Sequence, residues 1–119
     1  MLNGKFCSVK RLVKACGYSW HGLTFTWRNE VAFQQESWAF LVLLPLAFWW
    51  PETHLESAIL VISLFVVLIT ELINTAVEAA IDRHGDEQHH WSGVAKDVAS
   101  AAVLLALIQC VLVWLLVLF

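Results

Sequence analysis

Four polar side chains interrupt the long apolar segment in the middle of the chain. They recur three or four residues apart within ITELINTAVEAAID and are Glu71, Asn74, Glu78 and Asp82. At about 100° per residue, a helix places all four within about 80° of one another, on one face that spans about three turns. A carboxylate in hydrocarbon costs on the order of a few kcal/mol, so this face must meet other helices, water or a polar ligand.

Such an acidic face suits two kinds of chemistry. Paired carboxylates can hold Mg²⁺ while it remains partly hydrated and bridges phosphates, or they can relay protons through a transporter. A structural alternative is that the acids make interhelical hydrogen bonds or salt bridges that assemble the bundle. The residues alone leave the choice between phosphate and protons open.

The segment that follows, DRHGDEQHHWSGVAKD, adds groups that suit phosphate. Ser92 is expected to cap the next helix. Lys96 and Asp97 then fall in its first turns, where free backbone N–H groups already favour anions. A negatively charged ligand at this end would meet Arg83, Lys96 and the basic N-terminal segment.

Three apolar runs can carry these residues across a bilayer. The chain has 119 residues, of which 60% are hydrophobic and 14% charged, whereas about 45–50% is usual for apolar residues in a soluble domain. The run at 98–119 is long enough to cross a hydrocarbon core of about 30 Å, and the helical pattern extends the other two beyond their apolar residues. We predict an all-α membrane protein of one domain, residues 1–119, with transmembrane helices at about 30–50, 56–83 and 92–118.

Residues 1–28 repeat a different pattern. Apolar residues at helical spacing alternate with basic ones, which is typical of an amphipathic helix at a membrane surface. The apolar positions are Val9, Leu12, Val13, Cys16, Trp20, Leu23 and Trp27. Gly17 is a possible break in this helix. We expect the lipid bilayer, and no nucleic acid, as the partner of this surface.

The basic residues also indicate orientation. All seven Lys and Arg either precede the first span or lie in the connector between the second and third. The other connector, at 50–56, carries two acids and no basic residue. By the positive-inside rule, the N-terminus and the 82–97 connector are cytoplasmic and the C-terminus lies on the opposite side of a multi-pass protein.

Four motifs, taken in order, resemble one known family. GYSWHGL (17–23), WRNEVAFQQE (27–36), ELINTAVEAAIDR (71–83) and AKDVASAAVLLA (95–106) are together similar to the bacterial integral-membrane diacylglycerol kinases. The resemblance runs from about Arg11 to Trp114. It implies a homotrimeric bundle in the bacterial inner membrane, with active sites between subunits, that phosphorylates diacylglycerol with Mg²⁺ and ATP.

The resemblance also implies roles for single residues. Glu71 would be the general base at the lipid hydroxyl, Glu30 and Glu78 would hold Mg²⁺, and Asn74, Lys96 and Asp97 would complete the catalytic site. The positions that match ATP contacts are Arg11, Tyr18, Glu30, Glu78, Glu87, Gln88, His89, Lys96 and Asp97. Those that match lipid-substrate positions are Arg11, Glu71, Ser100 and Trp114.

Two other functions are alternatives. Undecaprenol kinases resemble this chain in fold and acidic face, although GYSW, AFQQE and the Gly85–Gly93 connector look more like the diacylglycerol branch. A non-enzymatic three-span membrane subunit would need neither Lys96 nor a pairing of Glu30 with Glu78. One departure from the family pattern is Val94, which stands where a basic residue is common.

Overall fold

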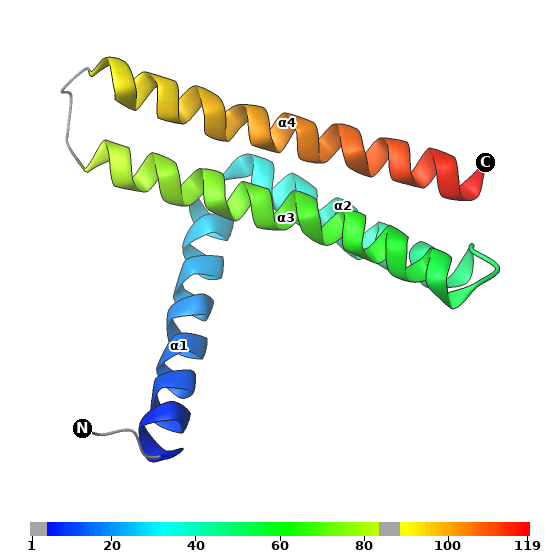
Figure 1. Ribbon diagram of the computed structural model, residues 1–119, viewed down its shortest axis with the longest axis horizontal. Helices are drawn as coiled ribbons and strands as arrows, with labels where there is room; N and C mark the ends of the chain where they lie inside the picture. The colour runs from blue at the N-terminus through cyan, green and yellow to red at the C-terminus, as the bar shows by residue number, and fades with distance from the viewer. Residues whose placement is uncertain (1–4, 84–88) are drawn as a thin grey trace.

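A computed structural model describes residues 5–83 and 89–119, with side chains from Ser8 onward. The described residues form four α-helices (Figure 1): α1 (Lys5–Asn29), α2 (Val31–Trp49), α3 (His54–Asp82) and α4 (His90–Leu118). Helices α2, α3 and α4 are each long and apolar enough to cross a membrane. The prediction of an all-α membrane protein with a separate N-terminal helix and three spans is therefore confirmed.

The three spans differ in length. Helix α2 has 19 residues, whereas α3 and α4 have 29 each, so their lengths are about 28 Å and about 44 Å. A hydrocarbon core of about 30 Å cannot cover the longer two from end to end. Their terminal turns therefore extend past the apolar layer, and the acidic face occupies the last turns of α3.

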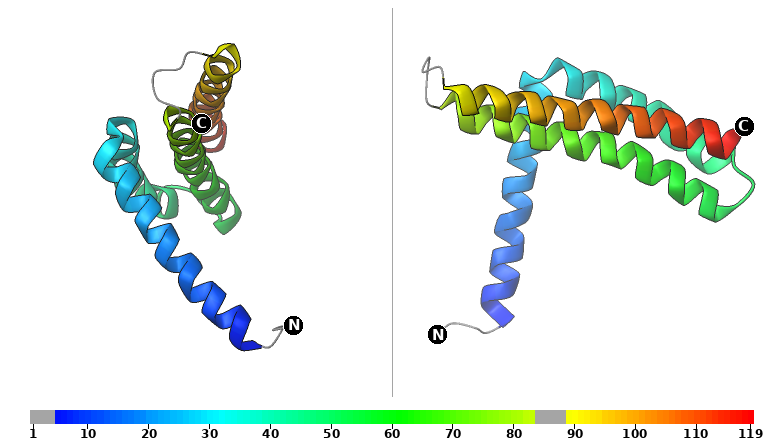
Figure 2. Two further views of the ribbon diagram at one scale, coloured as in Figure 1. Left: turned by 90° about the vertical axis from the view of Figure 1, so that its left-hand side faces the viewer. Right: turned by 45° about the horizontal axis from the view of Figure 1, so that its top comes forward.

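Helix α3 is the centre of the bundle. It runs antiparallel to α4 beside it and antiparallel to α2, which lies on another side of it in the end view (Figures 1 and 2). All the other helices contact α3. Its buried face carries Leu60, Leu64, Val67, Glu71 and Thr75, which recur at the three- and four-residue spacing of a packed helix face.

A polar cluster joins α3 to α4 far from the acidic face. The Ser63 hydroxyl accepts a hydrogen bond from Trp114 Nε1 at 3.1 Å. Gln109 Nε2 donates to the backbone oxygen of Ser63 at 3.0 Å, and Cys110 Sγ lies 3.7 Å from the Ser63 hydroxyl. Polar groups in apolar helices are satisfied by such cross-helix bonds, which hold the two helices in register.

Helix α1 is continuous through Gly17, so the possible break is not present. One glycine costs a helix only about 1 kcal/mol relative to alanine, and 25 residues share that cost. The helix extends away from the bundle crosswise to the three spans (Figures 1 and 2). Exposed Val9, Leu12 and Val13 lie on it, as expected for a helix that rests on a membrane surface.

A short joint at Glu30 turns the chain from α1 into α2. Glu30 has extended backbone angles, φ −117° and ψ 108°. The joint stays closely bonded, because Glu30 N–H donates to the oxygen of Thr26 at 2.9 Å and Gln34 N–H donates to the oxygen of Glu30 at 3.2 Å. The position of the Glu30 side chain is therefore determined by both helices.

Helix α4 begins earlier than predicted. Its N-cap is His89, whose Nδ1 accepts a hydrogen bond from Trp91 N–H at 3.2 Å. Ser92 lies within the first turn and its N–H donates to the backbone oxygen of His89 at 3.0 Å. The prediction of Ser92 as the cap was wrong because a histidine ring nitrogen accepts the bond that a serine hydroxyl usually accepts.

Candidate active site

The acidic face of α3 lies along the buried side of the helix and opens toward its end. Glu71 is only 3% exposed, Asn74 and Glu78 are half-buried, and Asp82 is exposed. Asn74 Nδ2 donates to Glu78 Oε1 at 3.1 Å, so two of the predicted site residues are in direct contact. The face thus runs from a carboxylate enclosed by protein to one in solvent.

Glu30 and Glu78 form a carboxyl pair across the joint and α3. Their side chains lie within hydrogen-bonding reach of each other. Burial, followed by the charge and the hydrogen bond of Glu78, raises the pKa of Glu30, and the more distant Glu71 adds to this. Two facing carboxylates repel unless a cation or a proton lies between them. The structure therefore brings together the two residues that were predicted to hold Mg²⁺.

This pair suits Mg²⁺ better than a softer metal. Carboxylate oxygens are the ligands that Mg²⁺ prefers, and it is commonly bound through one or two carboxylates plus substrate phosphates. Across the described side chains, at 8–83 and 89–119, no three His, Cys, Asp or Glu residues come together as a complete metal cage. An ion at Glu30 and Glu78 would therefore have coordination positions left for phosphate oxygens and water.

Lys96 lies at the same end of the bundle. Its Nζ bonds Asp82 Oδ1 at 2.7 Å, and their side chains are 43% and 65% exposed. This is the one ion pair within the described part of the chain, and it joins the last turn of α3 to the first turns of α4. An exposed pair is weak, so Lys96 can exchange its partner for a phosphate oxygen without breaking a core contact.

A polar pocket of about 430 Å³ lies at the beginning of α4. It is lined by His89, His90, Gly93, Val94 and Asp97. The first backbone N–H groups of a helix have no partner within the helix and attract anions. The pocket brings His89 and Asp97 together, as expected if both contact a nucleotide. The predicted contacts Glu87 and Gln88 lie outside the described residues.

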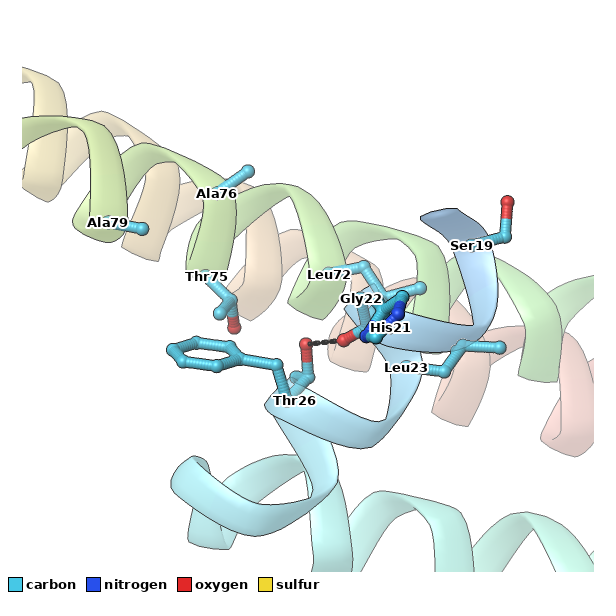
Figure 3. Close-up of a pocket in the computed structure, with 10 residues that line it drawn as sticks. Ser19, His21, Gly22, Leu23, Thr26, Leu72, Thr75, Ala76 and Ala79 are labelled. Atoms are coloured by element: carbon cyan, nitrogen blue, oxygen red, sulfur yellow. Dashed lines mark hydrogen bonds between the residues drawn. The ribbon is translucent and has the colours of Figure 1, made fainter. Parts of the chain in front are cut away.

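An apolar pocket of about 630 Å³ lies between α1 and α3 (Figure 3). Small side chains line much of it, with Thr26 on α1 and Thr75 and Ala76 on α3. Thr75 Oγ1 donates to the backbone oxygen of Glu71 at 3.1 Å, so the pocket adjoins the turn that carries Glu71. An apolar chain of a lipid can occupy this volume beside the turn of α3 that carries Glu71.

Four predicted residues have no hydrogen bond to the acidic face among the described residues. Arg11 and Tyr18 are exposed on α1, and Arg11 lies about 12 Å of helix before Ser19, which lines the apolar pocket. Ser100 is exposed on α4. Trp114 lies 14 residues, or about 21 Å, farther along α4. A single chain therefore brings together the acidic residues of the site but not these four residues.

Glu36 is a site residue that the sequence analysis missed. Its carboxyl group lies within hydrogen-bonding reach of Glu71, although the sequence analysis gave Glu36 no role. Its spacing was the available signal, because Phe33, Glu36, Phe40 and Ala47 fall on one face of a helix. Phe33 and Ala47 on that face are buried, and a carboxylate on a buried face indicates a polar partner.

Fold and site together define a small polytopic membrane protein with a carboxylate-lined site at one end of its bundle. The model of a family described as prokaryotic diacylglycerol kinase matches residues 17–118. The chain belongs to this family of enzymes, as the motifs indicated.

Relatives support this membership. The chain is 46% identical to the diacylglycerol kinase of Escherichia coli K12 over 104 residues, which are 87% of this chain and 85% of that protein. It is 39% identical to the diacylglycerol kinase of Haemophilus influenzae over 110 residues, which are 92% and 93% of the two chains. The diacylglycerol kinase of Pseudomonas aeruginosa is 39% identical over 106 residues, 89% of this chain and 86% of the relative.

Proposed function

We propose that this chain transfers the γ-phosphate of ATP to the free hydroxyl of diacylglycerol, with Glu71 as the general base and Mg²⁺ on the phosphates. The observation that carries the proposal is the burial of Glu71 on a face whose other end is open to solvent. Phosphate arrives from the aqueous end and the lipid hydroxyl from the bilayer. Family membership supports the lipid class, since the relatives are named diacylglycerol kinases.

The residues have separate tasks in this reaction. Glu71 accepts the hydroxyl proton as the lipid oxygen attacks the γ-phosphorus. The bond from the γ-phosphorus to the bridging oxygen breaks and ADP leaves. Lys96 exchanges Asp82 for a phosphate oxygen, and Asn74 orients Glu78 through their hydrogen bond. Phosphoryl transfer depends mainly on such positioning and charge neutralisation.

Glu30 and Glu78 are the residues that would hold Mg²⁺. The ion, when bound, supplies positive charge to the phosphates. Without it, the facing carboxyl groups would repel an incoming polyphosphate. We therefore expect phosphate transfer at this site to require a divalent cation.

The proposed setting is a bacterial inner membrane, with the N-terminus and the 82–97 connector in the cytoplasm, where ATP is present. We also propose a homotrimer whose neighbouring subunits supply α1 residues to each site. The isolated position of Arg11 and Tyr18 on the extended α1 supports this arrangement, because they need a second chain to approach an acidic face.

The test is transfer of ³²P from γ-labelled ATP to dioleoylglycerol in mixed micelles with Mg²⁺. Glu71→Gln keeps size and shape but cannot accept the proton, so turnover should fall by about 10²- to 10⁴-fold while the KM for ATP changes little. Glu52→Gln, the same change at an exposed acid on the opposite connector, is the matched control and should be fully active. Labelling by Glu71→Gln at the rate of the parent protein would refute the assignment of the base.

Undecaprenol is the counter-substrate in the same assay. Labelled phosphatidic acid with no undecaprenyl phosphate supports diacylglycerol as the acceptor. The reverse result would assign the chain to the alternative lipid, and no product from either lipid would refute the kinase.

A further inference from the structure

Acidic and aromatic layers stack along the contact between α2 and α3. The aromatic rings of Phe40 and Phe65 meet edge to face with centroids 4.9 Å apart, which sets the register of the two antiparallel helices. Glu36 lies four residues before Phe40 on α2, a rise of about 6 Å. Glu71 lies six residues after Phe65 on α3, a rise of about 9 Å in the same direction. The register thus places the two carboxyl groups in one layer.

Glu36 is half-buried, and one of its two carboxyl oxygens has no hydrogen-bond donor beside it. Glu36 Oε2 is buried and accepts no hydrogen bond from the described side chains or backbone. The polar group within its reach is the Glu71 carboxyl group, which is itself 3% exposed. A buried carboxylate with neither donor nor cation is costly, whereas a protonated carboxyl group can donate to Glu71.

We propose that Glu36 is a positioning residue that donates a hydrogen bond from its carboxylic acid to Glu71 and so aims the base at the lipid hydroxyl. One oxygen of Glu71 accepts the bond from Glu36, and the other accepts the proton of the lipid hydroxyl. Glu36 keeps its proton throughout. Two carboxyl groups that share one proton, with only one of them ionised, are a known arrangement for acid–base work.

Other charged groups lie near this pair. Glu30 at the joint and Glu78 on α3 form the next layer toward the open end, and Lys96 on α4 is held by Asp82. Ionisation of Glu36 at high pH would place a second charge beside Glu71 and remove the donated bond. The turnover rate should therefore fall at high pH because Glu36 ionises.

The test compares two substitutions at one position. Glu36→Gln retains an N–H donor to Glu71 but cannot ionise, whereas Glu36→Leu fills the space without a donor. We would measure kcat from pH 6 to 10 at saturating Mg²⁺, ATP and dioleoylglycerol. Gln35→Leu is the matched control, since Gln35 is the exposed neighbour on α2 and its replacement should leave the pH profile unchanged.

At neutral pH, kcat of Glu36→Gln should exceed that of Glu36→Leu about tenfold or more, as expected for a hydrogen bond to a charged group. The alkaline fall of the parent protein should be absent in Glu36→Gln. Equal kcat values for the two variants would overturn the donor role. So would an alkaline fall in Glu36→Gln identical to that of the parent.

This inference rests on the proposed role of Glu71, and Glu71→Gln in the same series separates the two. Full activity of Glu71→Gln overturns the base and the positioning residue together. If Glu71→Gln is inactive but the Glu36 variants keep the kcat of the parent protein, only the positioning role of Glu36 is overturned. The KM for ATP of each Glu36 variant, expected to equal that of the parent, reports that the Glu30–Glu78 layer is intact.

Discussion

The bond from Trp114 to Ser63 allows a quantitative test of whether Trp114 is a structural residue or a lipid contact. The indole N–H donates to the Ser63 hydroxyl at 3.1 Å, and Ser63 is 2% exposed. Hydrogen bonds between membrane helices contribute about 0.6 kcal/mol on average and about 1.7 kcal/mol at most. Trp114→Phe and Ser63→Ala should each lower the free energy of unfolding by at least about 0.6 kcal/mol. The coupling energy between the two changes should equal the contribution of the hydrogen bond.

The assay is a double-mutant cycle on reversible unfolding in detergent micelles. The double variant should be more stable than the sum of the two single changes predicts, by about 0.6 to 1.7 kcal/mol. Trp91→Phe is the matched control, because Trp91 is 69% exposed near the beginning of α4 and should leave unfolding unchanged. Zero coupling, with a raised KM for diacylglycerol in Trp114→Phe, would refute the structural role and support the lipid contact expected from the family.

Two further predictions concern the residues proposed to bind Mg²⁺ and phosphate. Glu78→Gln keeps an acceptor for Asn74 but removes one charge from the cation site, so the Mg²⁺ concentration for half-maximal rate should rise about tenfold or more. An unchanged Mg²⁺ titration would contradict its role as a ligand. Lys96→Met should raise the KM for ATP about tenfold or more with little change in thermal unfolding, because its pair with Asp82 is exposed. Asp82→Asn breaks the same pair and keeps the lysine, so a KM change as large as that of Lys96→Met would show that the pair, and not phosphate binding, matters.

Periodicity predicted what lies on each helix. Hydrophobic length indicated the spans, and the three- and four-residue spacing of Glu71, Asn74 and Glu78 indicated a shared face, which the bond from Asn74 to Glu78 bears out. Both follow from the geometry of one helix taken alone. The extended residue Glu30 lies between the predicted surface helix at 1–28 and the predicted span at about 30–50.

Contacts between helices were harder to predict from spacing. The pairing of Glu36 with Glu71 depends on the register of α2 against α3, which the packing of Phe40 on Phe65 determines. The cap at His89 was missed because its acceptor is a ring nitrogen, whereas Ser92 has the residue type that usually caps helices. Gly17 was overestimated as a break because the cost of glycine is small beside the rest of a long helix.

The joint at Glu30 has a consequence for how the protein responds to its bilayer. A crosswise amphipathic helix settles at the depth of the lipid head groups, and Glu30 begins where that helix ends. The Glu30 carboxylate therefore lies at the depth of the membrane surface, while Glu78 belongs to a span that tilts as the bilayer thins or thickens. A bilayer thickness that tilts α3 relative to α1 would therefore change the distance between the Glu30 and Glu78 carboxylates.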